Sequence, residues 1–116
     1  MPRTSRSRQP GSLRRSNDPP LLILTSLAGG PKHGHALAKD IEAFAGVRLG
    51  PGALYGAITR LEEQALIEPL PSDDRRRPYR ITAAGSAALA DVAADMRQLA
   101  DVGISRLGLG LAGGLA

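Results

Sequence analysis

The 116-residue sequence has no cysteine and no tryptophan, and its aromatic side chains are one phenylalanine and two tyrosines. Without cysteine the chain has no disulfide bonds and no thiolate metal ligands, and nothing indicates an oxidising compartment. No apolar run is long enough to cross a bilayer. The arginine-rich start lacks the apolar stretch of a secretory signal. We therefore expect a cytoplasmic protein that makes no contact with a membrane.

Residues that commonly carry catalysis are also scarce. The sequence offers no phosphate-binding loop, no identifiable Ser-His-Asp arrangement and no carboxylate pair in a recognisable pocket. The only histidines, His33 and His35, do not share a helical face, and a metal site would need further ligands. We therefore expect that the protein is not an enzyme and that it binds neither a metal nor a cofactor. Structural or surface roles are favoured for both histidines, and a pH-sensing role stays open because imidazole titrates near neutrality.

Positive charge is concentrated at the N-terminus. Residues 1–16 contain five arginines and no acidic residue, which leaves ten of the fifteen basic side chains and all eleven acidic ones for the remaining hundred residues. The net charge of +4 therefore comes from this segment, which we interpret as a disordered basic arm. Arg14 and Arg15 are candidate DNA contacts, and the alternative is a tail with no role in binding.

The length of the chain suits one compact domain with tails. The first helix is expected to begin at Asn17 or Asp18, where an Asx side chain can cap the first amides, and to run to about Ala28. It is apolar on nearly every side, which is more than one small domain can cover. We therefore expect part of it to pack against a second chain. Its apolar residues are Leu21, Leu22, Ile23, Leu24 and Leu27.

Two further helices follow. The second is predicted over residues 34–45, with Gly46 ending it, and the third begins at Pro51 and continues to about Gln64. One face of the second helix carries apolar residues at helical spacing, namely Leu37, Ile41 and Phe44. The third helix is expected to bury a stripe of Leu54, Ile58 and Leu61.

The opposite face of the third helix has an unusual composition. A solvated helix face usually carries more Lys and Glu. The small and hydroxyl-bearing residues on this face instead suit close approach to DNA. Gly56 lets the backbone come near a phosphate or base, and Tyr55 and Thr59 can contact phosphates or a thymine methyl. In the alternative interpretation, Tyr55 packs over the preceding helix and Gly56 relieves a crowded helix crossing. The candidate DNA-binding residues on this helix are Pro51, Gly52, Tyr55, Gly56, Thr59 and Arg60.

A β-hairpin is predicted between Leu66 or Ile67 and Ile81. Pro69 and Pro71 cannot donate to a ladder, which confines their strand to an edge. The hairpin tip over residues 72–77 contains turn-favouring aspartates followed by three consecutive arginines. A basic hairpin beside an exposed helix is typical of a winged helix-turn-helix, in which the helix enters the major groove and the wing holds phosphates. The candidate phosphate contacts are Arg75, Arg76, Arg77 and Arg80.

The last helix is predicted from Ala83, capped by Thr82, to about Leu107. Its apolar residues recur at spacings of three and four, as in a packing seam. We expect this seam to form a dimer interface together with the first helix. The residues assigned to this interface are Leu22, Leu89, Val92, Met96 and Leu99. The glycine-rich residues 108–116 are expected to be a flexible tail.

These expectations give a mainly α fold with a small β-hairpin, a winged helix-turn-helix over residues 17–82 plus a C-terminal dimerisation helix over residues 83–107. Residues 21 to about 107 resemble the PadR family of bacterial winged-helix transcriptional regulators. The similar segments are PKHGHALAKDIEAFAG, LGPGALYGAITRLEEQALIEPL and RRRPYRITAAGSAAL. The resemblance implies a homodimer that binds operator DNA through the third helix and the wing, usually as a repressor.

Two positions depart from the family pattern. Gly50 stands where the family commonly has serine before Pro-Gly, so the side-chain cap is missing, and His35 stands where it commonly has tyrosine after His-Gly. The few aromatic residues disfavour an aromatic-lined dimer pore for flat drugs such as some family members possess. A small-molecule effector stays open as a partner, and the sequence does not identify it.

Three functional hypotheses follow from the sequence. The leading one is a dimeric, sequence-specific repressor that binds double-stranded DNA. The second is a winged-helix module whose exposed helix and wing meet a protein partner. The third is a nonspecific architectural DNA-binding protein that depends mainly on its arginine arm.

Overall fold

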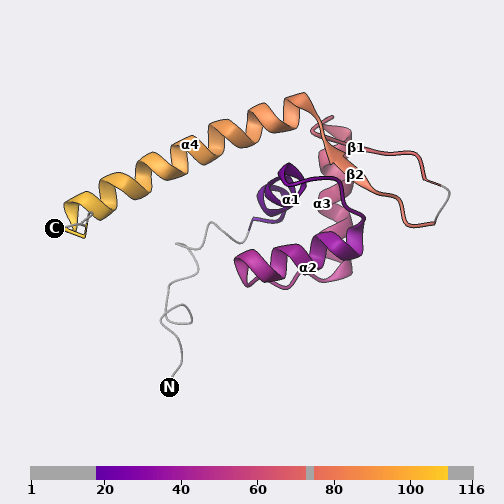
Figure 1. Ribbon diagram of the computed structural model, residues 1–116, viewed down its shortest axis with the longest axis horizontal. Helices are drawn as coiled ribbons and strands as arrows, with labels where there is room; N and C mark the ends of the chain where they lie inside the picture. Colours follow the sequence, from indigo (N-terminus) through magenta and orange to yellow (C-terminus); the bar gives the residue numbers. More distant parts are fainter. Residues whose placement is uncertain (1–17, 73–74, 110–116) are drawn as a thin grey trace, which may run out of the picture.

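The computed structural model describes residues 18–72 and 75–109, so the predictions for the arm, including Arg14 and Arg15, and for residues 110–116 lie outside the described residues. The fold is mainly helical with one hairpin, as predicted (Figure 1). None of the described helices is long and apolar enough to span a membrane. The elements in chain order are α1 (Pro19–Ala28), α2 (Gly34–Ala45), α3 (Pro51–Glu63), β1 (Ile67–Pro69), β2 (Tyr79–Ile81) and α4 (Ala83–Arg106).

Helix α1 is the centre of the domain. It contacts α2, α3, α4 and β2, so its apolar residues are covered on several sides within a single chain. Leu22 is only 4% exposed and belongs to the core. It has almost no surface left for a partner, and its assignment to a dimer interface is therefore corrected. Asp18 precedes the helix, but its side chain makes no capping hydrogen bond.

Helix α2 has the bounds predicted from the sequence. His33 is its N-cap, because the imidazole Nδ1 accepts a hydrogen bond from the Ala36 amide at 3.4 Å. Gly46 ends the helix in the left-handed conformation with φ of 69°, which glycine adopts without strain. Leu37 and Ile41 are buried as expected, but Phe44 is 47% exposed. Ala45, four residues after Ile41, packs against the core in the last turn instead of Phe44.

Helix α3 begins at Pro51 without a side-chain cap, because Gly50 has none to offer. The predicted stripe is buried, and Ala57 joins it. The hairpin then pairs β1 with β2 in antiparallel register, with Glu68 opposite Arg80. Pro69 lies in β1, which pairs only with β2 among the described residues, as expected for an edge strand.

The segment between α1 and α2 is attached to the other side of the hairpin. Lys32 and Tyr79 exchange two backbone hydrogen bonds, with the Lys32 amide donating to the Tyr79 carbonyl at 3.1 Å and the Tyr79 amide donating to the Lys32 carbonyl at 2.9 Å. The Lys32 ammonium also donates to the Ser26 carbonyl at 2.6 Å. The root of the wing is therefore held against the N-terminus of α2.

A single residue, Thr82, connects β2 to α4. The Thr82 amide donates to the Leu66 carbonyl, its hydroxyl donates to the Ala65 carbonyl, and the same hydroxyl accepts from the Gly85 amide at 3.0 Å. Gly85 is buried, and a Cβ at this position would overlap the Leu66 carbonyl. The start of α4 is thus fixed closely to the end of α3 and the hairpin.

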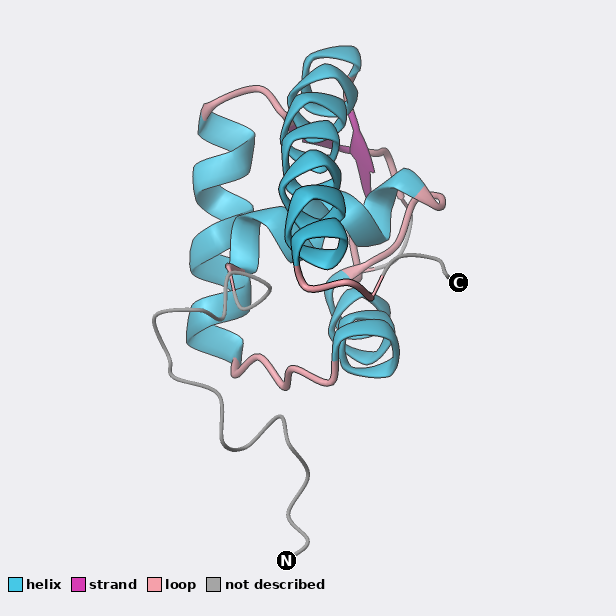
Figure 2. Cartoon of the chain, turned by 90° about the vertical axis from the view of Figure 1, so that its left-hand side faces the viewer, coloured by secondary structure: helices cyan, strands magenta, loops and turns pink. Residues whose placement is uncertain are grey.

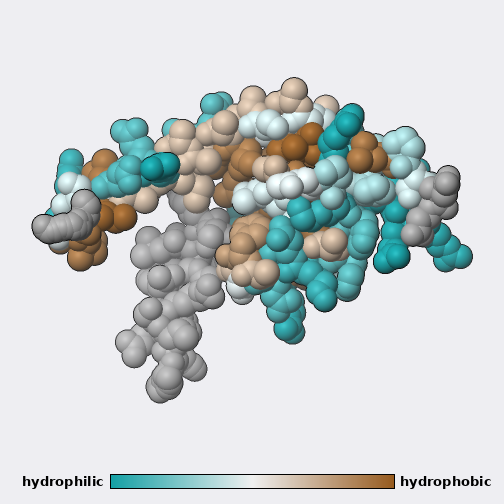
Figure 3. All heavy atoms as spheres, viewed as in Figure 1, coloured by the Kyte–Doolittle hydropathy of each residue, from teal (hydrophilic) through white to brown (hydrophobic). Residues whose placement is uncertain are grey.

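Beyond its first turns, α4 leaves the domain. It projects away from the three short helices in Figure 1, and Figure 2 shows the two strands behind the helices when the free end of α4 faces the viewer. Leu89 is half-buried and packs against the core. From residue 90 onward every described residue is exposed. Apolar surface lies along the projecting helix and at its free end (Figure 3), and it includes Val92, Met96, Leu99 and Leu107.

Candidate nucleic-acid interface

The predicted DNA-binding face of α3 is open to solvent. Burial of Leu54, Ala57, Ile58 and Leu61 against the core turns the opposite side of the helix outward. Gly56 is half-buried, and the remaining candidates on this helix are exposed. These exposed candidates are Pro51, Gly52, Tyr55, Thr59 and Arg60.

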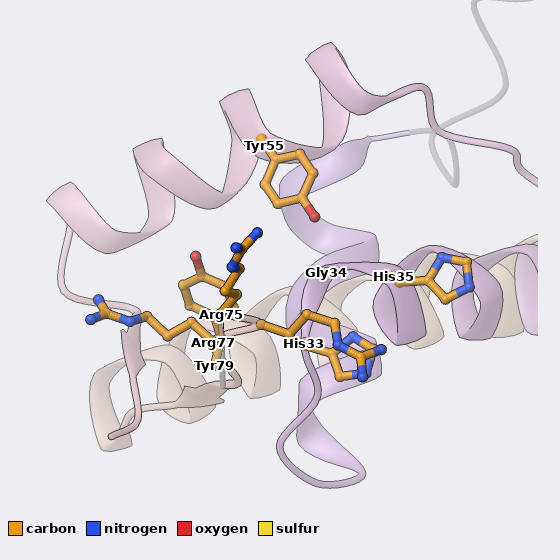
Figure 4. Close-up of a pocket in the computed structure, with 8 residues that line it drawn as sticks. His33, Gly34, His35, Tyr55, Arg75, Arg77 and Tyr79 are labelled. Carbon is orange, nitrogen blue, oxygen red and sulfur yellow. The ribbon is translucent and has the colours of Figure 1, made fainter. Parts of the chain in front are cut away.

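Tyr55 makes contacts that fit both interpretations offered by the sequence. Its phenol ring lies against the backbone of Gly34, and a Cβ at Gly34 would overlap that ring. Figure 4 shows the Tyr55 hydroxyl directed toward Gly34. The residue nevertheless remains 49% exposed. Tyr55 therefore joins α3 to the start of α2 and still offers half of its surface to a partner.

The two glycines of α3 do not relieve crowding. At Gly52, no described atom outside the neighbouring residues and the local helix backbone lies within 4 Å of the place that a Cβ would take. At Gly56 the nearest such atom is Nη1 of Arg60, at 3.8 Å. Since folding does not require glycine at either position, their lack of side chains leaves the helix backbone accessible from outside.

Thr59 has one of its polar groups already engaged. Its hydroxyl donates to the Tyr55 carbonyl at 2.9 Å, four residues earlier on the same helix. The hydroxyl oxygen can still accept a hydrogen bond, and the methyl group is available for apolar contact. These two properties suit the edge of a base in the major groove.

The arginines of the wing differ in their surroundings. Arg75, Arg76 and Arg77 are exposed at the end of the hairpin. Arg75 and Arg77 form no ion pair with any residue that the structure describes, whereas the Arg80 guanidinium donates from Nε to the Glu68 carboxylate at 2.8 Å. Arg80 therefore stiffens the ladder and is less available to an outside phosphate than Arg75 or Arg77.

The helix and the wing meet at a pocket of about 220 Å³ (Figure 4). Its lining comes from the start of α2, from Tyr55 on α3, and from the wing and Tyr79. The Lys32–Tyr79 pairing places these parts together. Sequence patterns did not assign His33 and His35 to this site, because only the bridge between the α1–α2 link and β2 brings them next to the wing. The lining residues are His33, Gly34, His35, Tyr55, Arg75, Arg76, Arg77 and Tyr79.

Tyr79 stays a neutral hydrogen-bonding group. Burial raises the pKa of its hydroxyl above the ordinary value of 10.0, and the negative charge of Glu62 acts in the same direction. The guanidinium of Arg77 opposes this rise. The Tyr79 hydroxyl is therefore protonated at neutral pH and can donate to an anion in the pocket.

Among the described residues, no cluster of His, Asp and Glu could hold a metal ion.

Comparisons with known proteins agree with this geometry. The family model of the PadR-like transcriptional regulators matches residues 23–91. A Streptomyces fradiae protein, an uncharacterised 37.1 kDa protein in transposon TN4556, is 47% identical over 85 residues, which cover 73% of this chain and 25% of that protein. The chain thus spans about a quarter of the length of this relative.

Solved structures show the same fold. A PadR family transcriptional regulator from Eggerthella lenta is 32% identical, with a TM-score of 0.66 over 83% of this chain and 85% of that one. A PadR family regulator from Clostridium difficile is 24% identical, with a TM-score of 0.67 over 76% of this chain and 95% of that one. The chain belongs to the PadR-like family of transcriptional regulators, and it has the winged-helix fold.

Proposed function

We propose that the chain acts as a dimeric, sequence-specific repressor that binds operator DNA through α3 and the wing. The observation that carries this proposal is the convergence of two surfaces. Tyr55 on the open face of α3 and the exposed arginines at the wing tip line the same pocket. One duplex can therefore meet a helix that fits the major groove and cations that hold the adjacent phosphates.

The two surfaces have different tasks in this proposal. Gly52 and Gly56 let the backbone of α3 approach the DNA, and Thr59 offers an acceptor and a methyl group to base edges. Arg75 and Arg77 neutralise phosphates, which positions the protein without reading sequence. Pro51, Tyr55 and Arg60 lie on the same exposed face as the reading residues.

Dimerisation is supported by the exposed apolar side chains of α4. Val92, Met96 and Leu99 recur on one face of a helix that projects from its own domain, where nothing in the described chain covers them. A second copy can cover this face symmetrically. Two winged domains related in this way would read an operator with two-fold symmetry.

The function is tested by measuring the affinity of the full chain for a duplex from the promoter of its own gene and for a scrambled duplex of equal length. We expect clear preference for the promoter at moderate salt. Equal affinity for both duplexes would indicate an architectural protein. Absence of binding to either duplex at low salt would instead favour a module for protein contacts.

Replacing Arg75 and Arg77 together with alanine should weaken binding to both duplexes by a similar factor. Each lost phosphate contact should reduce the slope of log affinity against log salt by about one unit. Fluorescence anisotropy over a salt series measures both quantities. Arg97→Ala, which removes an exposed arginine of α4, provides the matched control and should leave the slope unchanged. A double variant that loses affinity for the promoter alone would contradict this assignment.

Replacing Thr59 should change selectivity instead. We expect Thr59→Ala to lower the ratio of promoter to scrambled affinity by roughly fivefold or more, because a base contact is worth about 1–3 kcal/mol of discrimination. Thr59→Val keeps the methyl group and removes the hydroxyl. If Thr59→Val retains the ratio, the methyl group is the reading element. An unchanged ratio in both variants would remove Thr59 from the reading surface.

A further inference from the structure

The pocket between α2, α3 and the wing contains two imidazoles that the proposed function does not use. His33 is half-buried and His35 is exposed. Their rings are nearly parallel, with an interplanar angle of 11° and centroids 6.5 Å apart. One phosphate group with its hydrogen bonds can span a separation of this size. Both rings lie at the same pocket as the wing arginines.

The two imidazoles differ in the freedom of their nitrogens. Nδ1 of His33 accepts the hydrogen bond from the Ala36 amide, so Nε2 must carry the proton of the neutral ring. His33 can therefore donate through Nε2 without losing its cap. His35 has no such bond to another described residue, and both of its nitrogens are available. The pair offers one ring whose Nε2 faces outward as a donor and one ring with both nitrogens available.

The remaining lining of the pocket also consists of donors. Tyr55 and Tyr79 contribute hydroxyls, and three arginines contribute guanidinium groups. No Asp or Glu among the described residues lines the pocket. Such a set of donors suits an anion with several acceptor oxygens, and a phosphate group fits both the chemistry and the volume of about 220 Å³.

We propose that this pocket binds a phosphate group against His33 and His35, and that protonation of His35 strengthens the binding. In the context of the proposed function, on which this inference rests, the group is a backbone phosphate of the DNA. Binding of DNA then takes up a proton. The repressor should hold its operator more tightly at mildly acidic pH than at mildly alkaline pH.

The direction of the effect follows from the charges around the histidines. A phosphate bound beside an imidazole favours the protonated form of that ring. Lys39 adds one more exposed cation on α2. Asp40 on the same helix accepts from the Ser26 hydroxyl at 2.6 Å, and Glu62 on α3 raises the pKa of Tyr79. The titratable groups that face the imidazoles from α3 and β2 are the hydroxyls of Tyr55 and Tyr79.

Proton uptake is tested by measuring the affinity for the promoter duplex at about pH 6 and about pH 8, at constant ionic strength. We expect roughly tenfold tighter binding at the lower pH, since one proton taken up changes affinity by at most about tenfold per pH unit. His35→Gln should abolish most of this difference. His33→Asn keeps a side chain that can cap α2 and should weaken binding at every pH. A pH difference that persists undiminished in His35→Gln would overturn the proposal.

Nuclear magnetic resonance of the imidazole signals identifies the source of the phosphate. Titration with the duplex and, separately, with inorganic phosphate should shift the resonances of both histidines, while chloride at equal ionic strength should not. Shifts with the duplex alone would restrict the site to backbone phosphates. If the resonances of both histidines stay unchanged in both titrations, no phosphate enters the pocket.

These results separate the inference from the function on which it rests. If DNA affinity is independent of pH and the histidine resonances do not shift, the phosphate pocket is refuted and the repressor proposal stays intact. Histidine shifts with inorganic phosphate in a protein that binds no duplex would refute the repressor proposal. They would also establish the pocket as a site for a small phosphate and overturn its assignment to the DNA backbone.

Discussion

Replacing Met96 with aspartate should convert the proposed dimer into a folded monomer. Met96 is 37% exposed in the single chain, so a carboxylate is tolerated there while the partner is absent. In the proposed dimer the same carboxylate would be buried without a counter-charge, at a cost of several kcal/mol. Sedimentation velocity should show the change in mass, and circular dichroism should show unchanged helix content.

The matched control for this experiment is Ala94→Asp. It adds the same charge to the same exposed helix, but on the side facing away from Met96. The Ala94→Asp protein should remain a dimer. A Met96→Asp protein that stays dimeric and folded would show that the stripe through Val92 and Leu99 is not the interface.

Gly85→Ala should destabilise the domain strongly. The added methyl group would overlap the backbone carbonyl of Leu66, which cannot turn aside as a flexible side chain could. The start of α4 would have to move, with loss of the hydrogen bonds at Thr82. We expect a loss of about 2 kcal/mol or more. Thermal unfolding should then begin roughly 10 °C lower, because about 1 kcal/mol corresponds to 4–8 °C in a domain of this size.

Gly56→Ala contrasts with Gly85→Ala, because it places the same methyl group on a helix where there is room for it. The site for its methyl group is open, and alanine favours helix by about 0.5–1 kcal/mol over glycine. The melting temperature should therefore rise, while DNA affinity should fall if the backbone of α3 closely approaches the duplex. A Gly85→Ala protein as stable as the wild type would mean that α4 can shift at little cost.

Local sequence signals predicted most of the fold. Pro51, Gly46 and Thr82 mark helix boundaries by backbone rules that need no tertiary information, and the structure places each at the expected boundary. The paired prolines likewise identified β1 as an edge strand. In these places local chemistry and the global fold agree.

The errors come from contacts between segments distant in sequence. Leu22 was assigned to a second chain because a helix that is apolar all round exceeds what one neighbour can cover, yet α1 has four neighbours within its own domain. Phe44 keeps the helical spacing of its face, but Ala45 takes the position against the core in the last turn. The histidines reach the wing only through the pairing of Lys32 with Tyr79, which no local pattern encodes.

Because only Thr82 separates β2 from α4, the orientation of the wing and the orientation of α4 are coupled. One residue separates the strand from the helix, and that residue makes four hydrogen bonds, so we expect the two elements to change direction together. In the proposed dimer, a change in the crossing angle of the two α4 helices would therefore swing the two wings apart or together without deforming either domain. In that dimer, the spacing of half-sites that the protein accepts would be set by the contact through Val92, Met96 and Leu99, away from the DNA.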